Sequence, residues 1–418
     1  MRRVVIAGMI GNGLEWYDFA LYGYFAPTLG KLFFPGSDPY VQLISTYGIF
    51  ATGFLMRPVG GLLFGTLGDK YGRKFALTLS LLMMAVPTAC IGLLPTYASI
   101  GIWAPMLLAC VRMIQGLALA GQFTGSITFI VEHAPADKRG AAGGTTILSL
   151  CAGMLLGSAS ATFMAEILPQ AAFESWGWRV PFFLGIVIAF VGFYIRHHTE
   201  ESPHYEKAKD EGALSQTPVR ETLRLHLGKL VRGVGIYLSV TVPFYTLTVF
   251  LNGFLSGILG YSIKDALLIS TLSMILLMLL VVPTAALSDR WGRRRMLMAT
   301  AVVYFVASYP LFWLMTQPGF FSALMAVMLL TVIVGFYIGA APTVFVELFP
   351  TSVRYTGMAI SYNICAALFG GTAPIVETWM IKQAHGMNTV PALYLMLCAA
   401  LSFISFIGYH DRYKEELQ

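Results

Sequence analysis

Charged residues are scarce in this chain. Of its 418 residues, 11% are charged and 57% are hydrophobic, and the mean hydropathy is +0.71. A soluble domain carries roughly 25% charged residues, so the composition excludes a soluble globular protein. The five cysteines form no C-x-x-C pair and all fall in hydrophobic stretches. We therefore expect them to pack as apolar residues, without a disulfide or a metal.

Sequence signatures of an enzyme are also missing. There is no P-loop, so we expect no direct use of ATP. Glycine-rich clusters lie in hydrophobic stretches with no strand before them, which excludes a dinucleotide-binding fold, and no metal-ligand spacing is present. We predict a protein that is not an enzyme and that needs no cofactor or metal.

The hydrophobic residues are gathered in stretches long enough to cross a bilayer, which takes about 20 residues. These stretches lie at 4–29, 41–67, 75–94, 101–131, 141–168, 177–196, 230–259, 266–288, 296–315, 320–348, 355–381 and 390–409. We predict an all-α integral membrane protein with twelve transmembrane helices in two pseudo-symmetric six-helix bundles, 1–196 and 230–418. The hydrophilic segment 197–229 joins them as a loop, within which residues 218–230 fit a short amphipathic helix or a plain tether.

Basic residues indicate the orientation of these helices. Most of the 27 Lys and Arg residues lie in segments on the side of the N-terminus, and the other side keeps Lys31, Arg179, Lys264 and Lys382. This positive-inside bias predicts that both termini lie in the cytoplasm. The net charge of +6 therefore reflects topology, and we expect no nucleic-acid partner.

A motif occurs twice in the chain. Residues 65–74 (GTLGDKYGRK) recur as 285–294 (AALSDRWGRR), and the segment 131–139 shares its Val-Glu, Pro and Arg with 346–354. Such a repeat in an apolar chain is typical of a membrane transporter built from two bundles.

The charged residues of these repeats predict a gate. An Asp beside the N-terminus of a neighbouring helix accepts backbone hydrogen bonds, and the helix dipole favours its charge. Arg73 and Arg139 are candidate partners for Asp69 and Glu132. Such a cluster would close one side while the other is open; the alternative is a static surface ion pair worth about 1 kcal/mol or less. The predicted gate residues are Asp69, Arg73, Glu132, Arg139, Asp289, Arg293, Glu347 and Arg354.

A few charges fall inside predicted spans. Glu15 and Asp18 share one face of the first helix by their i, i+3 spacing, and Arg57 and Arg112 are possible counter-charges. Two nearby carboxylates do not both ionise easily, so one is suited to carry a proton. The alternative is a permanent ion pair that orients the helices. We predict Asp18, Glu15 and Arg112 as the residues of proton coupling.

Aromatic residues crowd the same region. Aromatic faces attract ammonium groups, although a single aromatic in a span is more often a packing residue. Trp16 and Tyr17 are the strongest candidates because they stand next to two carboxylates. The predicted substrate-binding residues are Trp16, Tyr17, Arg57, Arg112, Tyr245, Asn252, Tyr337, Tyr362, Asn363 and Trp379.

Several segments resemble the major facilitator superfamily. The duplicated loop and residues 112–116 (RMIQG) are similar to superfamily motifs. A narrower resemblance, to the metabolite:H⁺ symporter family, is carried by residues 11–19, 57–61, 176–182, 347–354 and 370–374. Within that family, residues 30–39 and 391–396 look most like the bacterial proline/glycine betaine transporters.

The resemblance implies uptake of a small polar metabolite with protons across a bacterial inner membrane, by alternating access to a site between the bundles. One departure matters. The family usually has a Glu in the fourth helix where this chain has Gln122. Proton coupling must then use Glu15 or Asp18, or be absent.

We therefore expect a proton symporter of a small zwitterionic osmolyte such as proline or betaine. It would act as a monomer in the lipid bilayer, and the proton gradient would drive it. The first alternative is a proton symporter of di- or tricarboxylates such as 2-oxoglutarate or citrate, which would use both Arg57 and Arg112. The second is an uncoupled uniporter or exporter, which Gln122 would favour.

Overall fold

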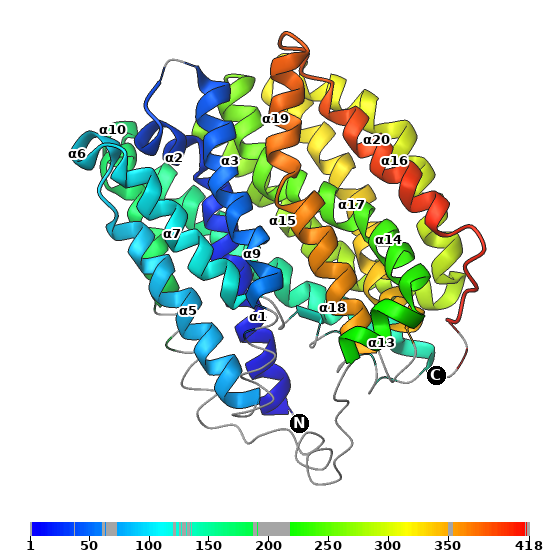
Figure 1. Ribbon diagram of the computed structural model, residues 1–418. Coiled ribbons are helices and arrows are strands. Elements are labelled where there is room, and N and C mark those ends of the chain that lie inside the picture. Colours follow the sequence, from blue (N-terminus) through cyan, green and yellow to red (C-terminus); the bar gives the residue numbers. More distant parts are fainter. Residues whose placement is uncertain are drawn as a thin grey trace.

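The computed structural model describes most of the chain as helix. The described residues are 2–36, 38–60, 63, 73–119, 123–124, 127, 131, 134, 136–186, 190, 218–349, 354–413 and 415. Within this part no strand occurs, and both termini lie at the same end of the helix bundle (Figure 1).

The amino-terminal half is built from short and long helices. They are α1 (Arg2–Tyr24), α2 (Ala26–Phe33), α3 (Pro39–Leu55), α5 (Arg73–Leu93), α6 (Tyr97–Ile100), α7 (Trp103–Ala118), η1 (Ala136–Lys138), α9 (Arg139–Ile167), α10 (Gln170–Ser175) and η2 (Gly177–Arg179).

The carboxy-terminal half begins after the connecting segment. Its elements are α13 (Pro218–Leu225), α14 (Leu227–Tyr245), η3 (Thr246–Phe250), η4 (Gly253–Ile258), α15 (Ile263–Trp291), α16 (Arg293–Met315), α17 (Phe320–Leu348), α18 (Arg354–Cys365), η5 (Ala366–Gly370), α19 (Ala373–Gln383) and α20 (Pro391–Ser405). Helix α13 confirms that the end of the connecting segment is helical. The limits predicted for the two bundles and their linker stay a prediction.

The helices lie where the hydrophobic stretches predicted them. Six helical segments in the described part are long and apolar enough to cross a membrane: Arg139–Ile167, Leu227–Phe250, Ile263–Trp291, Arg293–Met315, Phe320–Leu348 and Gly357–Gln383. The other predicted spans coincide with α1, α3, α5, α7, α20 and the helical residues 180–186. The predicted all-helical membrane fold is confirmed.

The outward faces of these helices are apolar. Large hydrophobic side chains such as Leu279, Val306 and Phe321 leave 66–81% of their surface uncovered. A soluble protein rarely exposes large contiguous apolar patches, whereas a bilayer solvates them.

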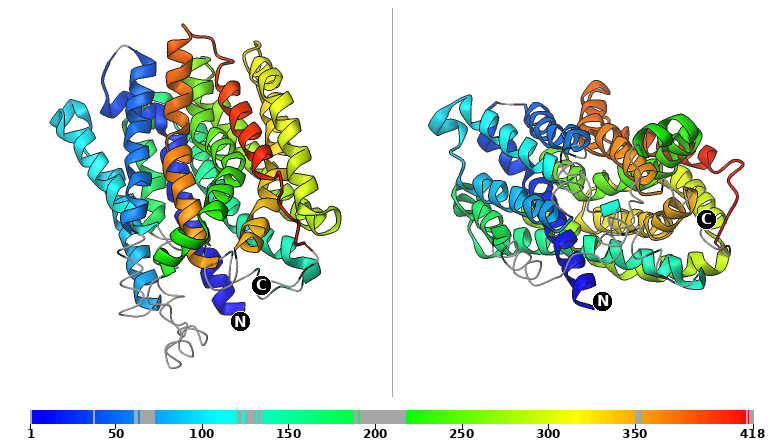
Figure 2. Two further views of the ribbon diagram at one scale, coloured as in Figure 1. Left: turned by 45° about the vertical axis from the view of Figure 1, so that its right-hand side comes forward. Right: turned by 60° about the horizontal axis from the view of Figure 1, so that its bottom comes forward.

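Helix α9 holds the two halves together. It packs against α1 within its own half and against α15 and α17 of the other half (Figures 1 and 2). Glycines allow the close approach: a Cβ on Gly153 would lie 1.9 Å from the carbonyl oxygen of Gly13 in α1, and one on Gly144 would lie 2.8 Å from Ala285 Cβ. Small residues are the usual solution where helices meet in a membrane.

Three segments of the described carboxy-terminal half are wound as π-helix. They are η3 and η4, which continue α14, and η5, which continues α18. Pro243 lies just before η3 and cannot donate a backbone hydrogen bond, which weakens the α-helical ladder at this point. π-Helical turns are frequent at functional sites, and η3 packs against α1 and α19.

The α1–α9 contact generates a stability prediction. We expect Gly153→Ala to destabilise the protein by about 1–3 kcal/mol, because the added methyl group meets a backbone carbonyl that has no room to move. Gly48→Ala in α3 is the matched control: nothing lies within 4 Å of its Cβ, and alanine favours a helix by up to about 1 kcal/mol. The midpoints of thermal unfolding of the purified variants give the comparison, and equal midpoints would contradict the predicted close packing.

Candidate functional site

Helix α1 presents its polar residues to the protein interior. Glu15 and Asp18 are only 4% and 3% exposed. Asn12 Nδ2, one turn earlier, donates to Thr146 O at 3.3 Å and to Ser149 Oγ at 2.9 Å in α9. These bonds, together with the close glycine contact, set the rotation of α1, so that both carboxylates face inward.

Asp18 lies in a buried polar network with α5 and α7. Its Oδ1 accepts from Thr88 Oγ1 at 2.5 Å, and its Oδ2 accepts from Gln115 Nε2 at 2.8 Å and from Arg112 Nη1 at 3.4 Å. Arg112 Nη1 also donates to Gln115 Oε1 at 2.8 Å. The structure thus brings Asp18 and Arg112 together as an ion pair. Such a buried pair is tolerable only where further hydrogen bonds satisfy both charges.

Thr88 and Gln115 were not among the predicted site residues. Gln115 follows Arg112 by three residues, so the two share a helix face, and this spacing was a usable signal. The sequence carried no signal for Thr88, because threonine is common in apolar helices.

The second carboxylate of α1 has a different arginine. The charge of Glu15 acts on Arg57, which is 1% exposed. The Arg57 guanidinium carbon lies 4.4 Å from the ring centre of Phe54, 5.5 Å from that of Phe19 and 5.8 Å from that of Tyr362. Asp18 therefore pairs with Arg112, while the charge of Glu15 acts on Arg57.

Aromatic side chains from both halves surround Arg57. Trp16 packs edge-on against Phe244 at 5.5 Å between ring centres, and Phe54 packs edge-on against Tyr245 at 5.1 Å. The aromatic cluster consists of Trp16, Phe54, Phe123, Phe244, Tyr245 and Tyr362. All six are buried.

Polar atoms in this cluster lack partners among the described residues. They are Trp16 Nε1, the Tyr245 hydroxyl, and Arg57 Nε and Nη2. Buried polar atoms are almost always hydrogen-bonded in folded proteins. Four such atoms in one place indicate a site made to receive a polar ligand.

Two predicted substrate-binding residues have structural contacts instead. Tyr17 OH donates to the carbonyl of Pro181 at 2.7 Å, and Tyr337 OH donates to the carbonyl of Ile236 at 3.0 Å. Both bonds lie within one half and away from the aromatic cluster.

Three others also lie outside the cluster. Trp379 leaves 52% of its surface uncovered on the outer face. Asn252 accepts a hydrogen bond from Ser270 Oγ in α15 at 2.8 Å, and Asn363 is half-buried in α18. The structure thus gathers Trp16, Tyr245 and Tyr362 around Arg57. Trp379, Asn252 and Asn363 lie apart from them.

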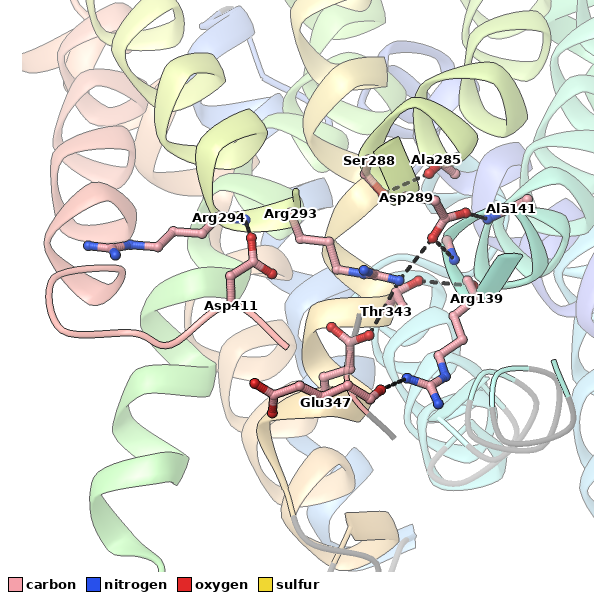
Figure 3. A network of polar contacts seen from close by, with 12 residues as sticks. Arg139, Ala141, Ala285, Ser288, Asp289, Arg293, Arg294, Thr343, Glu347 and Asp411 are labelled. Atoms are coloured by element: carbon pink, nitrogen blue, oxygen red, sulfur yellow. Dashed lines mark hydrogen bonds and ion pairs between the residues drawn. The ribbon is translucent and has the colours of Figure 1, made fainter. Parts of the chain in front are cut away.

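A polar clasp joins the halves at the end where the termini lie. Asp289 in α15 accepts from the backbone N–H of Gly140 at 2.8 Å and of Ala141 at 3.0 Å, in the first turn of α9 (Figure 3). Arg293 Nη2 lies 2.9 Å from Asp289 Oδ1 and 3.3 Å from Glu347 Oε1. Lys138, at the N-cap of α9, makes no side-chain cap, so Asp289 caps this helix from the other half of the molecule.

Arg139 is tied to the same region. Its Nη1 donates to the Glu415 carbonyl at 2.6 Å, and its own carbonyl accepts from Thr343 Oγ1 at 3.3 Å. Four predicted gate residues, Arg139, Asp289, Arg293 and Glu347, therefore come together. Asp69 and Glu132 lie outside the described residues, as do Gln122 and the side chains of Arg73 and Arg354.

The opposite end of the molecule also has contacts between the halves. Lys382 in α19 donates to Asp38 at 2.8 Å, and Lys264 in α15 lies 3.5 Å from Glu166 in α9. The hydrogen bond from Lys382 lowers the pKa of Asp38 below its usual value, and the backbone N–H groups of Tyr40 and Val41 add to this effect. Neither pair was predicted, because the sequence carries no signal of which exposed charges face each other.

Among the described residues, no group of three or more His, Cys, Asp or Glu could hold a metal ion.

The sequence matches the family model described as Major Facilitator Superfamily over residues 8–374. It is 36% identical to the glycine betaine/proline/ectoine/pipecolic acid transporter OusA of Dickeya dadantii and 35% identical to the proline/betaine transporter of Escherichia coli K12. Each alignment covers 97% of this chain and 82% of the relative. It is also 33% identical to the inner membrane metabolite transport protein YhjE of E. coli, over 99% of this chain and 95% of that one.

Solved structures share the fold at low identity. A crystal structure of a D-xylose-proton symporter aligns with a TM-score of 0.75 at 19% identity, over 96% of both chains. A partially occluded inward-open form of the xylose transporter XylE of E. coli aligns with a TM-score of 0.76 at 18% identity, over 99% of both chains.

The clasp generates a prediction about hydrogen exchange. We expect Asp289→Asn to speed amide exchange at Gly140 and Ala141 by about tenfold to a hundredfold, because a hydrogen bond to a charged group contributes about 1.5–3 kcal/mol. Hydrogen–deuterium exchange of the purified chain, read at the first turn of α9, measures this. Asp265→Asn in the same helix α15 is the control, since Asp265 is half-buried at the other end of the helix and bonds with Ser262 in its first turn. Equal protection in both variants would mean that Asp289 does not hold α9.

Proposed function

This chain belongs to the Major Facilitator Superfamily, and we propose that it takes up a small zwitterionic osmolyte of the proline or betaine type together with protons. The observation that carries this proposal is the aromatic cluster around Arg57, built by both halves and containing buried polar atoms without partners among the described residues. The relatives that share about a third of its residues are named as transporters of proline and betaine.

The cluster matches both charges of a zwitterion. Trp16, Phe244 and Tyr245 offer aromatic faces, which attract an ammonium or quaternary amine. Arg57 offers Nε and Nη2, the two atoms that a carboxylate can engage side by side. The charge of Glu15 is close enough to balance Arg57 when no substrate is bound.

A dicarboxylate substrate fits less well. It would need Arg112 as a second cation, yet Arg112 is already held by Asp18 and Gln115. The organic-acid alternative is therefore not favoured.

Asp18 is the group we assign to proton coupling. As an anion it pairs with Arg112. A proton on either oxygen removes the charge, so that Arg112 loses the ionic part of its attraction to Asp18 and keeps its bond to Gln115. Loading and unloading of the proton would thus change how firmly α1 is held against α7.

Alternating access follows from the contacts at the two ends. The Asp289 clasp closes the end with the termini, while Lys382 and Lys264 pair across the opposite end. Opening one set while the other holds would expose the aromatic cluster to one side at a time. We further propose that the chain works as a monomer in a bacterial inner membrane with both termini in the cytoplasm, driven by the proton gradient without a cofactor.

Reconstituted transport tests the proposal directly. In proteoliposomes with an inward proton gradient, we expect labelled proline or betaine to accumulate above its outside concentration, and a protonophore to abolish the accumulation. The protonophore abolishes accumulation because it collapses the proton gradient that drives the symport. 2-Oxoglutarate and citrate serve as comparison substrates; accumulation of these acids alone would contradict the zwitterion, and equilibration that ignores the protonophore would contradict the coupling.

The role of Asp18 has its own prediction. We expect Asp18→Asn to lose gradient-driven accumulation but to retain exchange of labelled for unlabelled substrate, because the amide oxygen can still accept from Gln115 but the side chain can no longer bind and release a proton. Counterflow and uphill uptake are measured on the same vesicles, with Asp265→Asn as the control. Uphill uptake at the level of that control would remove Asp18 from the coupling role.

A further inference from the structure

Helix α19 carries a buried acid that the proposed mechanism does not use. Glu377 is 0% exposed and lies in the carboxy-terminal half, six residues before the end of α19 at Gln383. An ionised carboxyl buried among apolar helices is costly unless a cation or several donors compensate it. The groups around Glu377 therefore decide whether its carboxyl group is ionised or protonated.

A proton on this acid would let Thr246 make both of its short contacts at once. Thr246 Oγ1 lies 2.9 Å from the carbonyl of Val242 and 2.6 Å from Glu377 Oε1. A hydroxyl has one hydrogen to donate. If Thr246 donates to Val242, as a threonine one turn along a helix usually does, the short contact is made only when the Glu377 carboxyl donates to Thr246 Oγ1.

The remaining neighbours supply no positive charge. The ionisable groups that act on Glu377 in the described part of the chain are Tyr47 from α3, Tyr304 from α16, and Tyr394 and Cys398 from α20. All four are neutral in their ordinary state. The contrast with Asp18, which has Arg112, indicates that the two buried acids hold protons differently.

Glu377 lies under the contacts that close the end remote from the termini. Tyr47 OH, from the other half, donates to the carbonyl of Val249 in η3 at 3.4 Å, and Lys382, five residues after Glu377, pairs with Asp38. Because Glu377 and Lys382 share helix α19, parting of these contacts would open a path for water from that end to Glu377.

We propose that Glu377 is a second proton-carrying group, loaded from the end remote from the termini. A hydronium ion at that end gives one proton to the carboxylate and is left as water, an O–H bond forms at the side chain, and the negative charge is lost. The neutral acid then fits the closed arrangement, in which it donates to Thr246. The inference rests on the proposed proton symport and adds to Asp18 a second site in the other half.

Infrared spectroscopy of the reconstituted full-length chain tests the protonation. We expect the carbonyl band of a protonated carboxyl group in the wild type and in Glu174→Gln, and its loss in Glu377→Gln. Glu174 is a matched control because it is an acid at the surface, bonded to Lys31 and Gln170. Thr246→Val should keep the band but shift its frequency, because the acid loses its acceptor. A wild-type spectrum without a band that Glu377→Gln removes would overturn the proposal.

Transport tests whether the proton moves. We expect Glu377→Gln to retain counterflow exchange and to lose the pH dependence of uphill uptake, and Glu377→Asp to restore that dependence. If Glu377→Gln accumulates substrate with the wild-type pH profile, the inference fails and the proposed function stands. If the wild type itself shows no proton-driven accumulation, both the proposed proton symport and the inference about Glu377 are wrong.

Discussion

A charge buried between apolar helices must find its partner inside the protein, and this constraint organises the interior of the molecule. Hydrocarbon cannot solvate it, so one charge at the bilayer centre costs at least about 2.5 kcal/mol. Asp18 has Arg112, and Asp289 lies between Arg293 and the first turn of α9. Each partner comes from a different helix or helix end. Satisfying the charges therefore also determines how the helices pack.

Helix α9 links the packing of the two halves, because it contacts α1 in one half and α15 in the other. Its contact with α1 is made by Gly13 and Gly153 at van der Waals limits, and that contact stays within one half. Its contact with α15 ends in the Asp289 clasp, which crosses between halves. The proposed rocking motion would have to part the second contact, in which Gly144 also lies close to Ala285, while the first stays together. The carboxylates on α1 would travel with α9 through such a motion.

The sequence predicted correctly those features that depend on the thickness of the bilayer or on residue types that are rare in this chain. The thickness of a bilayer sets the length of each hydrophobic stretch, and the observed helices follow those stretches. The repeat around Asp289 was noticed because charges are so few that a duplicated Asp and Arg stand out. Arg112 was found for the same reason. The structure brings Asp289 and Arg293 together, and their role as a gate stays a prediction. Among the aromatics, by contrast, Trp16 and Trp379 could not be separated, since spans are rich in both buried and lipid-facing rings.

What remained undecided was the rotation of each helix about its axis. Trp379 faces outward and Glu377, two residues earlier, is fully buried, yet nothing in the order of residues distinguishes their faces. The sequence by itself determined the number, length and duplication of the spans, because these depend on hydrophobicity and on repeated local motifs. Only the tertiary structure decided which arginine each acid of α1 faces, and that Glu377 has no cation among its described neighbours. Such pairings depend on packing between helices that lie far apart in the chain.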